Sequence, residues 1–214
     1  MIKHLSNLFP VVIIAILLSG CSENSQLKPL DKNASILAFG DSLTYGTGTS
    51  RDKAYPAVLA SLINRNVINA GIPGEASKKG LLRLPVLLER HQPELLIICH
   101  GANDILRKKD MALAKNNIQQ MIDLARNKDI QVVLIGVPEF SLFLSTSPIY
   151  QALADENVLP LEKDIIGDIL AQNALKSDQI HPNTQGYQIL AEKIRDLLID
   201  SGALEERESL PQKI

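Results

Sequence analysis

The chain has 214 residues, of which 45% are hydrophobic and 21% are charged, and its formal net charge at pH 7 is −2. A disordered chain would have fewer apolar residues and a larger net charge, and a small disulfide scaffold would have many more than two cysteines. The slightly acidic balance also provides no broad positive surface for a nucleic-acid partner, and the length suits one compact domain.

The first 20 residues resemble a bacterial lipoprotein signal peptide. Lys3 gives a positive start, and the apolar run at 11–18 is shorter than the roughly 20 residues of a transmembrane helix. The sequence Leu-Ser-Gly-Cys then follows at 18–21. The resemblance implies cleavage before Cys21 and a lipid on its thiol, hence a membrane anchor in the bacterial cell envelope. Ser22 favours the outer membrane in a host that has one, and the alternative is an uncleaved anchor helix.

The residues after the cysteine are polar and include Pro29. We expect residues 21–33 to be a lipidated cysteine with a flexible tether that reaches up to about 40 Å, at roughly 3.3 Å per residue. The folded domain is then expected to span 34–202, and 203–214 to form a polar tail. Cys99 lies within an apolar run, which indicates a buried residue without a chemical role.

Three continuous apolar runs indicate buried strands of a parallel sheet, at 36–39, 95–99 and 132–135. Shorter candidate strands are Val67-Ile68 and Val158-Leu159. Helical patterns occupy 54–64, 77–91, 111–127 and 161–171.

A final helix is the clearest, because its apolar residues from Tyr187 to Leu198 share one face. Asn183 or Thr184 can cap its start, and Gly202 lies past its end. The alternation predicts a single doubly wound, flavodoxin-like α/β domain with a mainly parallel five-stranded sheet.

The residues that follow each strand carry the functional information, since ligands of an open α/β sheet bind at the carboxyl ends of its strands. Four blocks stand out: Gly-Asp-Ser-Leu-Thr at 40–44, Asn-Ala-Gly-Ile-Pro-Gly-Glu at 69–75, Gly-Ala-Asn-Asp at 101–104 and Asp-Gln-Ile-His-Pro at 178–182. Their order and spacing resemble the GDSL or SGNH hydrolase family over roughly 35–198. Residues 69–85 and 91–93 are further similar to its bacterial thioesterase, lysophospholipase and arylesterase members.

The resemblance implies a serine hydrolase with Ser42 as nucleophile, His181 as base and Asp178 as the group that orients the histidine. It also implies an oxyanion hole made by the backbone N–H groups of Ser42 and Gly74 and by Asn103. Taken alone, Gly74 would be a turn glycine and Asn103 a helix cap. In a sheet of order 2-1-3-4-5, however, the loops that carry them would flank Ser42.

Two histidines compete for the role of base. His100 follows a predicted strand on the functional edge, but no acid precedes it closely in the sequence. His181 has Asp178 three residues earlier, and Pro182 restricts its backbone to extended conformations. We therefore favour His181 and expect His100 to be a packing or supporting residue.

Other chemistries fit the sequence less well. Gly40, Gly46 and Gly48 surround a strand-to-helix turn, but their spacing matches neither the dinucleotide fingerprint nor the phosphate loop. No set of His, Cys, Asp and Glu has metal-ligand spacing, so we expect no metal and no other cofactor. Asp41 and Asp104 are expected to bond to loop amides.

The predicted activity is hydrolysis of carboxylic esters (aryl esters, lysophospholipids or acyl thioesters) through an acyl-enzyme. Apolar residues near the predicted crevice either line an acyl groove or pack beneath the loops: Ile72, Leu106, Leu142, Phe143, Leu144, Ile149 and Tyr150. Since acyl-CoA is cytoplasmic, an envelope enzyme is expected to prefer esters or lysophospholipids. The alternative is a non-catalytic tethered lipoprotein of this fold that binds acyl or carbohydrate ligands.

Overall fold

A single parallel sheet forms the centre of the molecule in the computed structural model, which describes residues 26–141 and 143–205. Its strands have the order β2-β1-β3-β4-β5, and all four pairings are parallel. The strands are β1 (Ser35–Gly40), β2 (Asn66–Gly71), β3 (Leu95–Cys99), β4 (Gln131–Ile135) and β5 (Leu161–Glu162). The predicted doubly wound domain and its strand order are confirmed.

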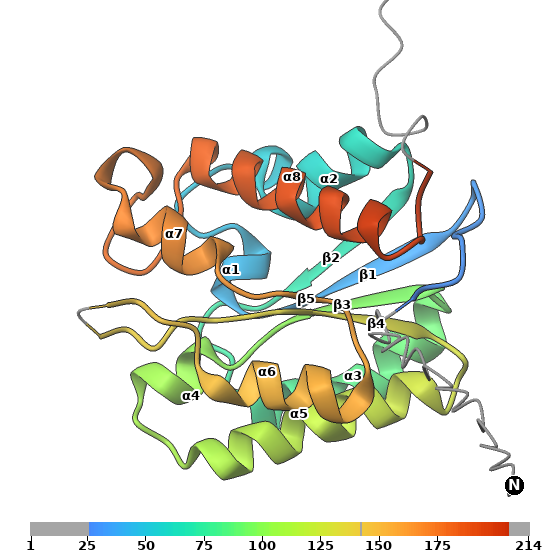
Figure 1. Ribbon diagram of the computed structural model, residues 1–214, viewed down its shortest axis with the longest axis horizontal. Helices are drawn as coiled ribbons and strands as arrows, with labels where there is room; N and C mark the ends of the chain where they lie inside the picture. The colour runs from blue at the N-terminus through green and yellow to red at the C-terminus, as the bar shows by residue number, and fades with distance from the viewer. Residues whose placement is uncertain (1–25, 142, 206–214) are drawn as a thin grey trace, which may run out of the picture.

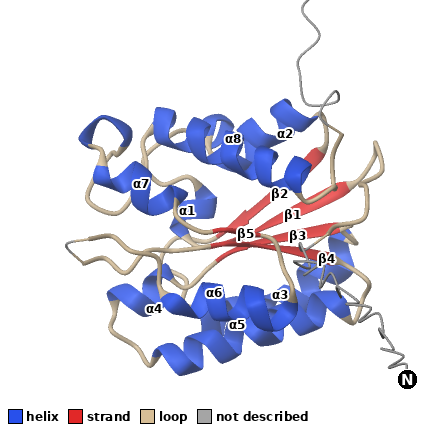
Figure 2. Cartoon of the chain, in the orientation of Figure 1, coloured by secondary structure: helices blue, strands red, loops and turns tan. Residues whose placement is uncertain are grey.

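Helices cover both faces of the sheet (Figures 1 and 2). One layer consists of α1 (Ser42–Tyr45), α2 (Tyr55–Ile63), α7 (Ile165–Ala171) and α8 (Thr184–Asp200). The other consists of α3 (Ser77–His91), α4 (Ala102–Leu106), α5 (Met111–Arg126) and α6 (Pro148–Asn157). Short 3-10 turns lie at Arg51–Lys53 and Asn173–Leu175. Within the described ranges, no helix is long and apolar enough to span a lipid bilayer.

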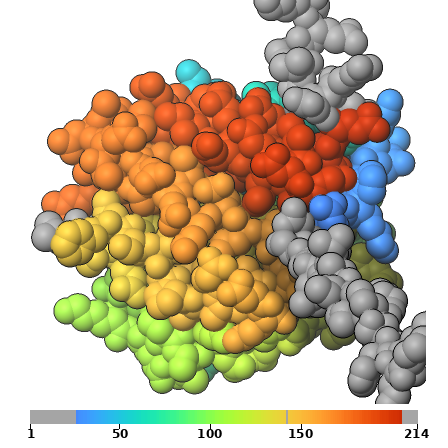
Figure 3. Space-filling view, in the orientation of Figure 1, coloured from blue at the N-terminus to red at the C-terminus, as the bar shows by residue number. Residues whose placement is uncertain are grey.

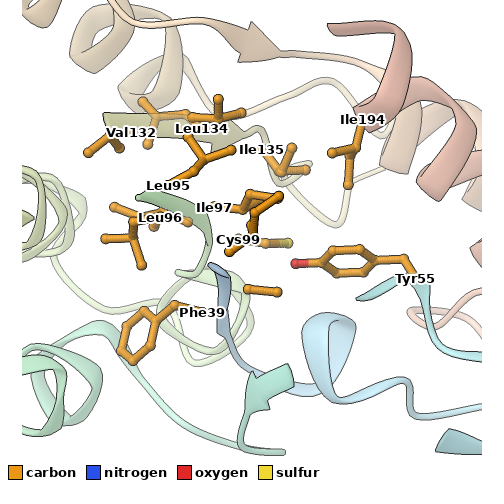
Figure 4. Close-up of a cluster of buried hydrophobic side chains, with 14 of the residues drawn as sticks. Phe39, Tyr55, Leu95, Leu96, Ile97, Cys99, Val132, Leu134, Ile135 and Ile194 are labelled. Carbon is orange, nitrogen blue, oxygen red and sulfur yellow. The ribbon is translucent and has the colours of Figure 1, made fainter. Parts of the chain in front are cut away.

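The core is built from the apolar strands and the helix faces packed against them. All five residues of β3 are buried, as a strand covered by helices on both faces requires. Figure 4 shows four of these side chains (Leu95, Leu96, Ile97 and Cys99) between Phe39 of β1 and the side chains of β4, with Tyr55 and Ile194 reaching in from α2 and α8. Cys99 is a free, buried thiol whose pKa is raised by burial, which agrees with the expected packing role.

The sequence prediction is wrong in the segment between β4 and α7. Val158 is not in a strand but ends α6 in the left-handed conformation, with φ 49°. The strand lies at Leu161–Glu162, and the expected helix at 161–171 begins only at Ile165. A two-residue strand is too short to show a periodicity of its own, and its apolar Leu161 extends the helical pattern that follows.

The structure also places the ends of the domain outside the expected limits of 34 and 202. Residues 26–33, expected as tether, run along the amino ends of β3 and β4 and pack on the end of α8. The Leu27 and Leu30 N–H groups donate to the carbonyls of Ser201 and Ala203, at 2.7 and 2.9 Å. Leu30 and Ala203 are buried, and so is Leu204. The expected signal peptide at 1–20 and Cys21 lie outside the described residues.

A buried carboxylate closes the amino end of α3. Asp104, at the start of α4, accepts hydrogen bonds from the Ser77 N–H at 2.7 Å and the Ser77 hydroxyl at 3.1 Å. The Asn117 amide on α5 donates to the same hydroxyl at 2.9 Å. Asp104 thereby satisfies a helix-end amide, as expected, and fixes α4 against α3 next to the loops at the carboxyl edge.

Replacing this carboxylate should destabilise the fold. Asp104→Ala leaves the buried Ser77 N–H and hydroxyl without their acceptor, so we expect the free energy of unfolding to fall by about 2–4 kcal/mol in urea denaturation. Asp110→Ala is the matched control, because Asp110 is an exposed cap that accepts from the Ala112 N–H at 2.8 Å. Its loss should cost only about 1 kcal/mol. Equal losses in the two variants would contradict the role given to Asp104.

Candidate active site

Ser42 stands at the first position of α1, directly after β1. Asp41 caps this helix by accepting from the Leu43 N–H at 3.2 Å. Gly40 makes the tight turn possible, because a Cβ there would lie 2.0 Å from the Cys99 carbonyl oxygen. The first N–H groups of a helix have no intrahelical acceptor. The turn therefore presents both the hydroxyl and the N–H of Ser42 at the carboxyl edge of the sheet.

His181, in the loop before α8, contacts this hydroxyl, and Asp178 of the same loop contacts His181. The His181 Nε2 atom lies 3.0 Å from the Ser42 Oγ atom, and the His181 Nδ1 atom lies 2.8 Å from Asp178 Oδ2. The other carboxylate oxygen, Oδ1, accepts from the N–H groups of Ile180 and His181, both at 2.8 Å. The loop is thus wrapped around its own carboxylate, and the imidazole bridges that carboxylate to the serine.

The carboxylate of Asp178 remains ionised in this loop although it is partly withdrawn from water. Partial burial acts to raise its pKa, but the hydrogen bonds from His181 and from the Ile180 N–H bring the pKa below its usual value. An ionised carboxylate is an acceptor only, so it favours the tautomer of His181 with the proton on Nδ1. The Nε2 atom then faces the serine hydroxyl as an acceptor.

The turn that carries Gly74 leaves one backbone donor unused. The Glu75 N–H donates to the Ile72 carbonyl at 3.2 Å, and Gly74 has φ +75° behind Pro73, as in a type II turn. The Gly74 carbonyl accepts from Arg107 Nη2 at 2.9 Å. Within the described chain, no hydrogen bond engages the Gly74 N–H. Since β1 lies between β2 and β3, this turn lies on one side of Ser42.

Asn103 comes from the other side, where α4 begins directly after the loop that follows β3. Its side chain is buried near Asp41, a carboxyl group whose pKa is raised by burial although the Asn103 side chain acts to lower it. Nδ2 itself has no hydrogen bond of good geometry among the described residues. A buried amide donor without a partner is uncommon in folded proteins. The unused Gly74 N–H, in the turn after β2, and the Asn103 amide, in the first turn of α4, therefore lie on the two sides of Ser42.

His100 does not belong to the contact chain of Ser42. It is fully buried, its Nε2 atom lies 3.2 Å from Glu75 Oε2, and its ring contacts Phe39 at 5.6 Å between centroids. The expectation of a packing or supporting histidine is confirmed by these contacts. Sequence reasoning missed Glu75 as its partner, because the carboxylate comes from another loop, 25 positions earlier.

Glu75 is also paired with Arg83, and both carboxylate oxygens lie 2.8 Å from the Arg83 Nε atom. Burial alone would raise the pKa of Glu75, but the hydrogen bonds from His100 and Arg83, with the charge of the guanidinium, hold that pKa below its usual value. Glu75 is therefore a buried, ionised carboxylate next to Gly74.

The candidate acyl groove is only partly formed by the expected residues. Ile72 and Leu106 are exposed, in the turn after β2 and at the end of α4, and Phe143 is 82% exposed on the loop after β4. For Tyr150 the second alternative holds, because it is fully buried beneath the loops and its hydroxyl donates to the His100 carbonyl at 2.7 Å. Leu142 lies outside the described residues. A cavity of about 200 Å³ lies between two segments, and residues from 105–111 and from 139–141 line it.

No group of three or more His, Cys, Asp or Glu side chains in the described ranges is placed to hold a metal ion. Serine, imidazole and carboxylate joined in this order at the carboxyl edge of a parallel α/β sheet are the arrangement of a serine hydrolase. The sequence model of the GDSL-like Lipase/Acylhydrolase family matches residues 38–189, and the chain belongs to this family.

Relatives of the chain have the same kind of activity. It is 30% identical over 193 residues to Esterase TesA of Pseudomonas aeruginosa, covering 84% of this chain and 95% of the relative. It is 30% identical over 165 residues to Thioesterase 1/protease 1/lysophospholipase L1 of Escherichia coli strain K12, covering 73% and 79%. A crystal structure of TesA superimposes with a TM-score of 0.72 at 27% identity, over 78% of this chain and 99% of that one. The chain is thus a hydrolase with an esterase function.

The lowered pKa of Glu75 makes stability depend on acid pH. A carboxyl group with a lower pKa in the folded state stabilises the fold fully above its unfolded-state pKa, near 4.5. This contribution is lost as the pH falls through the folded-state value. In urea denaturation from pH 7 to pH 3, we expect wild type to lose more stability below pH 4.5 than Glu75→Gln. Parallel curves for the two proteins would contradict an ionised Glu75.

Proposed function

We propose that Ser42, His181 and Asp178 form a catalytic triad that hydrolyses carboxylic esters through an acyl-enzyme. The observation that carries this proposal is the pair of short contacts at the imidazole, 3.0 Å to the Ser42 hydroxyl and 2.8 Å to Asp178. Both distances lie in the range needed for proton transfer and for orientation of the base. The side chain of His181 is 12% exposed, so substrate can reach a base that is otherwise held in place.

The reaction has two similar halves. Ser42 Oγ attacks the ester carbonyl carbon while His181 Nε2 removes the hydroxyl proton, and the carbonyl oxygen becomes an oxyanion. Collapse of this intermediate breaks the bond to the alcohol, which leaves with the proton from His181. Water then attacks the acyl-enzyme with His181 again as base, and releases the acid and free Ser42. Asp178 stabilises the positive imidazolium in both halves.

The oxyanion would be bound by the N–H groups of Ser42 and Gly74 and by the Asn103 amide. The unused Gly74 N–H supports this assignment, and so does Asn103 Nδ2, which makes no hydrogen bond of good geometry within the described residues, since a preorganised hole needs available donors. The central position of β1 supports it as well, because it puts one donor loop on each side of Ser42. Losing one such donor typically costs about 3–4 kcal/mol of transition-state stabilisation.

The proposed substrates are aryl esters and lysophospholipids, with acyl thioesters as substrates in vitro. Ile72, Leu106 and Phe143 are large apolar side chains exposed in the segments that follow β2, β3 and β4, Leu106 at the end of α4, where an acyl chain would lie. The Escherichia coli relative is named for thioesterase and lysophospholipase activities. A carboxylic ester is favoured over acyl-CoA because we also propose a location outside the cytoplasm.

This location follows from the sequence at the amino terminus. We propose that residues 1–20 are a signal peptide and that Cys21 is lipidated, which anchors the domain in the cell envelope. The support is the short apolar run that ends at Leu18-Ser19-Gly20 before the cysteine.

The triad is tested with Ser42→Ala. Wild type should hydrolyse p-nitrophenyl butyrate and become labelled by a fluorophosphonate probe, whereas Ser42→Ala should lose both properties, with activity down at least about 10⁴-fold. The melting temperature should stay nearly unchanged. Ser61→Ala, at an exposed serine of α2, is the control and should behave as wild type. A wild-type protein that binds ligands but resists the probe would instead be the non-catalytic lipoprotein.

The anchor is tested in a bacterial host with two membranes fed an alkynyl fatty acid. We expect wild type to incorporate the label and to sediment with membranes, and Cys21→Ser to lose both properties, because only a thiol accepts the diacylglyceryl group. Cys99→Ala should keep the label, since Cys99 is buried in the core. Labelled Cys21→Ser, or unlabelled wild type, would overturn the lipoprotein assignment.

A further inference from the structure

One buried side-chain cluster contacts all three loops that carry the proposed oxyanion donors. It consists of Glu75, Arg83 and His100, which we call the loop cluster. Glu75 directly follows Gly74, and His100 precedes Asn103 by three residues. Arg83 comes from the second turn of α3. The side chains of Glu75 and His100 are 6% and 0% exposed, and that of Arg83 is 21% exposed.

Arg83 connects the cluster to the ends of β1 and β2. Its Nη2 atom donates to the Ala70 carbonyl at 2.8 Å and to the Gly40 carbonyl at 3.2 Å. Its guanidinium also lies 4.2 Å from the centre of the Phe39 ring, which points away from Tyr55 and towards α3 (Figure 4). Gly40 precedes Ser42 by two residues, and Ala70 precedes Gly74 by four. One guanidinium therefore binds the backbone just before two donor loops.

Glu75 connects Arg83 to the third loop. Its carboxylate faces Arg83 Nε at 2.8 Å and Arg83 Nη2 at 2.7 Å, and its Oε2 atom lies 3.2 Å from His100 Nε2. Gly80 of α3 leaves room for the imidazole, because a Cβ there would lie 2.3 Å from His100 Nε2. The His100 ring is thus confined between α3 and Phe39 while it bonds to Glu75.

An ion pair of this kind is a poor source of stability alone. Removing two charges from water costs free energy that the attraction between them often only repays, so well-packed apolar residues can serve the fold equally well. Geometry is what the pair supplies here. The fork of an arginine can hold a carboxylate and two carbonyl groups at fixed angles, which a lysine cannot. Catalysis by backbone N–H groups requires such control, because misplacement by about 1 Å can cost roughly 100-fold in rate.

We infer that Glu75, Arg83 and His100 are positioning residues that set the relative placement of the Ser42 N–H, the Gly74 N–H and the Asn103 amide. The inference rests on the proposed function, since it assigns a purpose to contacts around the proposed oxyanion hole. The cluster acts through the loops and touches no reacting atom. Its effect falls on the chemical step, because the donors bind the oxyanion of the transition state and not the ground-state ester.

The test compares kcat per active site, with sites counted by stoichiometric fluorophosphonate labelling. Arg83→Lys keeps the charge but loses the fork, and we expect kcat on p-nitrophenyl butyrate to fall about 10- to 100-fold. KM should change less than about threefold, because ground-state binding is untouched. Glu75→Gln keeps the size of the side chain, and we expect the same fall in kcat with little change in KM. If Arg83→Lys does not fold, the result for Glu75→Gln alone tests the inference.

The matched control is Arg126→Lys. Arg126 ends α5 at the opposite edge of the sheet and likewise binds a carbonyl and a side-chain oxygen, both of Asn157. This variant should lose stability without change in kcat per labelled site. If the loop cluster were merely structural, its variants would also lose stability without a change in kcat. A kcat within twofold of wild type in folded Arg83→Lys and Glu75→Gln would therefore overturn the inference. If wild type takes no label at Ser42, the proposed function fails and the inference falls with it.

Discussion

The parallel pairing of β1 with β2 on one side and β3 on the other is the constraint on which the site depends. Gly40 lies opposite Gly71 and Cys99, so the three strands end level with one another. Three chain segments that are far apart in the sequence must therefore turn at the same edge. The space is so tight that a Cβ on Gly71 would lie 2.1 Å from the Tyr45 nitrogen. Glycine at the ends of β1 and β2 is therefore required for the loops to approach one another.

The regular part of this architecture could be predicted from the sequence because its signals are local. The helix expected at 77–91 occupies those residues, and α8 begins with Asn183 as its cap. The contact between Asp178 and His181 could be predicted for the same reason, since the two residues are only three positions apart in the sequence. Elements without a periodicity of their own were missed or displaced, namely the two-residue β5 and α6. For α6, the Pro148 in its first turn was an available start signal.

The loop cluster could not be predicted for a different reason. Its members are separated by 8 and 25 positions, and their contacts exist only once α3 has packed beneath the edge of the sheet. A histidine without an acid beside it in sequence therefore appeared unpartnered. The two carboxylates of the site also differ in environment, because the side chain of Asp178 is 51% exposed and that of Glu75 is 6% exposed. The carboxylate that orients His181 is therefore in contact with solvent, whereas the carboxylate that holds the loops after β2 and β3 is buried in the protein.

The attachment of residues 26–33 gives the molecule a direction. Lys28 and Asp31 bond to Gln131 and Glu94 at the amino ends of β4 and β3, whereas Ser42 lies at the carboxyl ends. The segment is the blue band at the right of Figures 1 and 3, on the side opposite α1 and α7 in Figure 1. Under the proposed anchor at Cys21, the attachment point and Ser42 would therefore lie at opposite ends of the strands, and the edge that carries Ser42 would stay open to solvent.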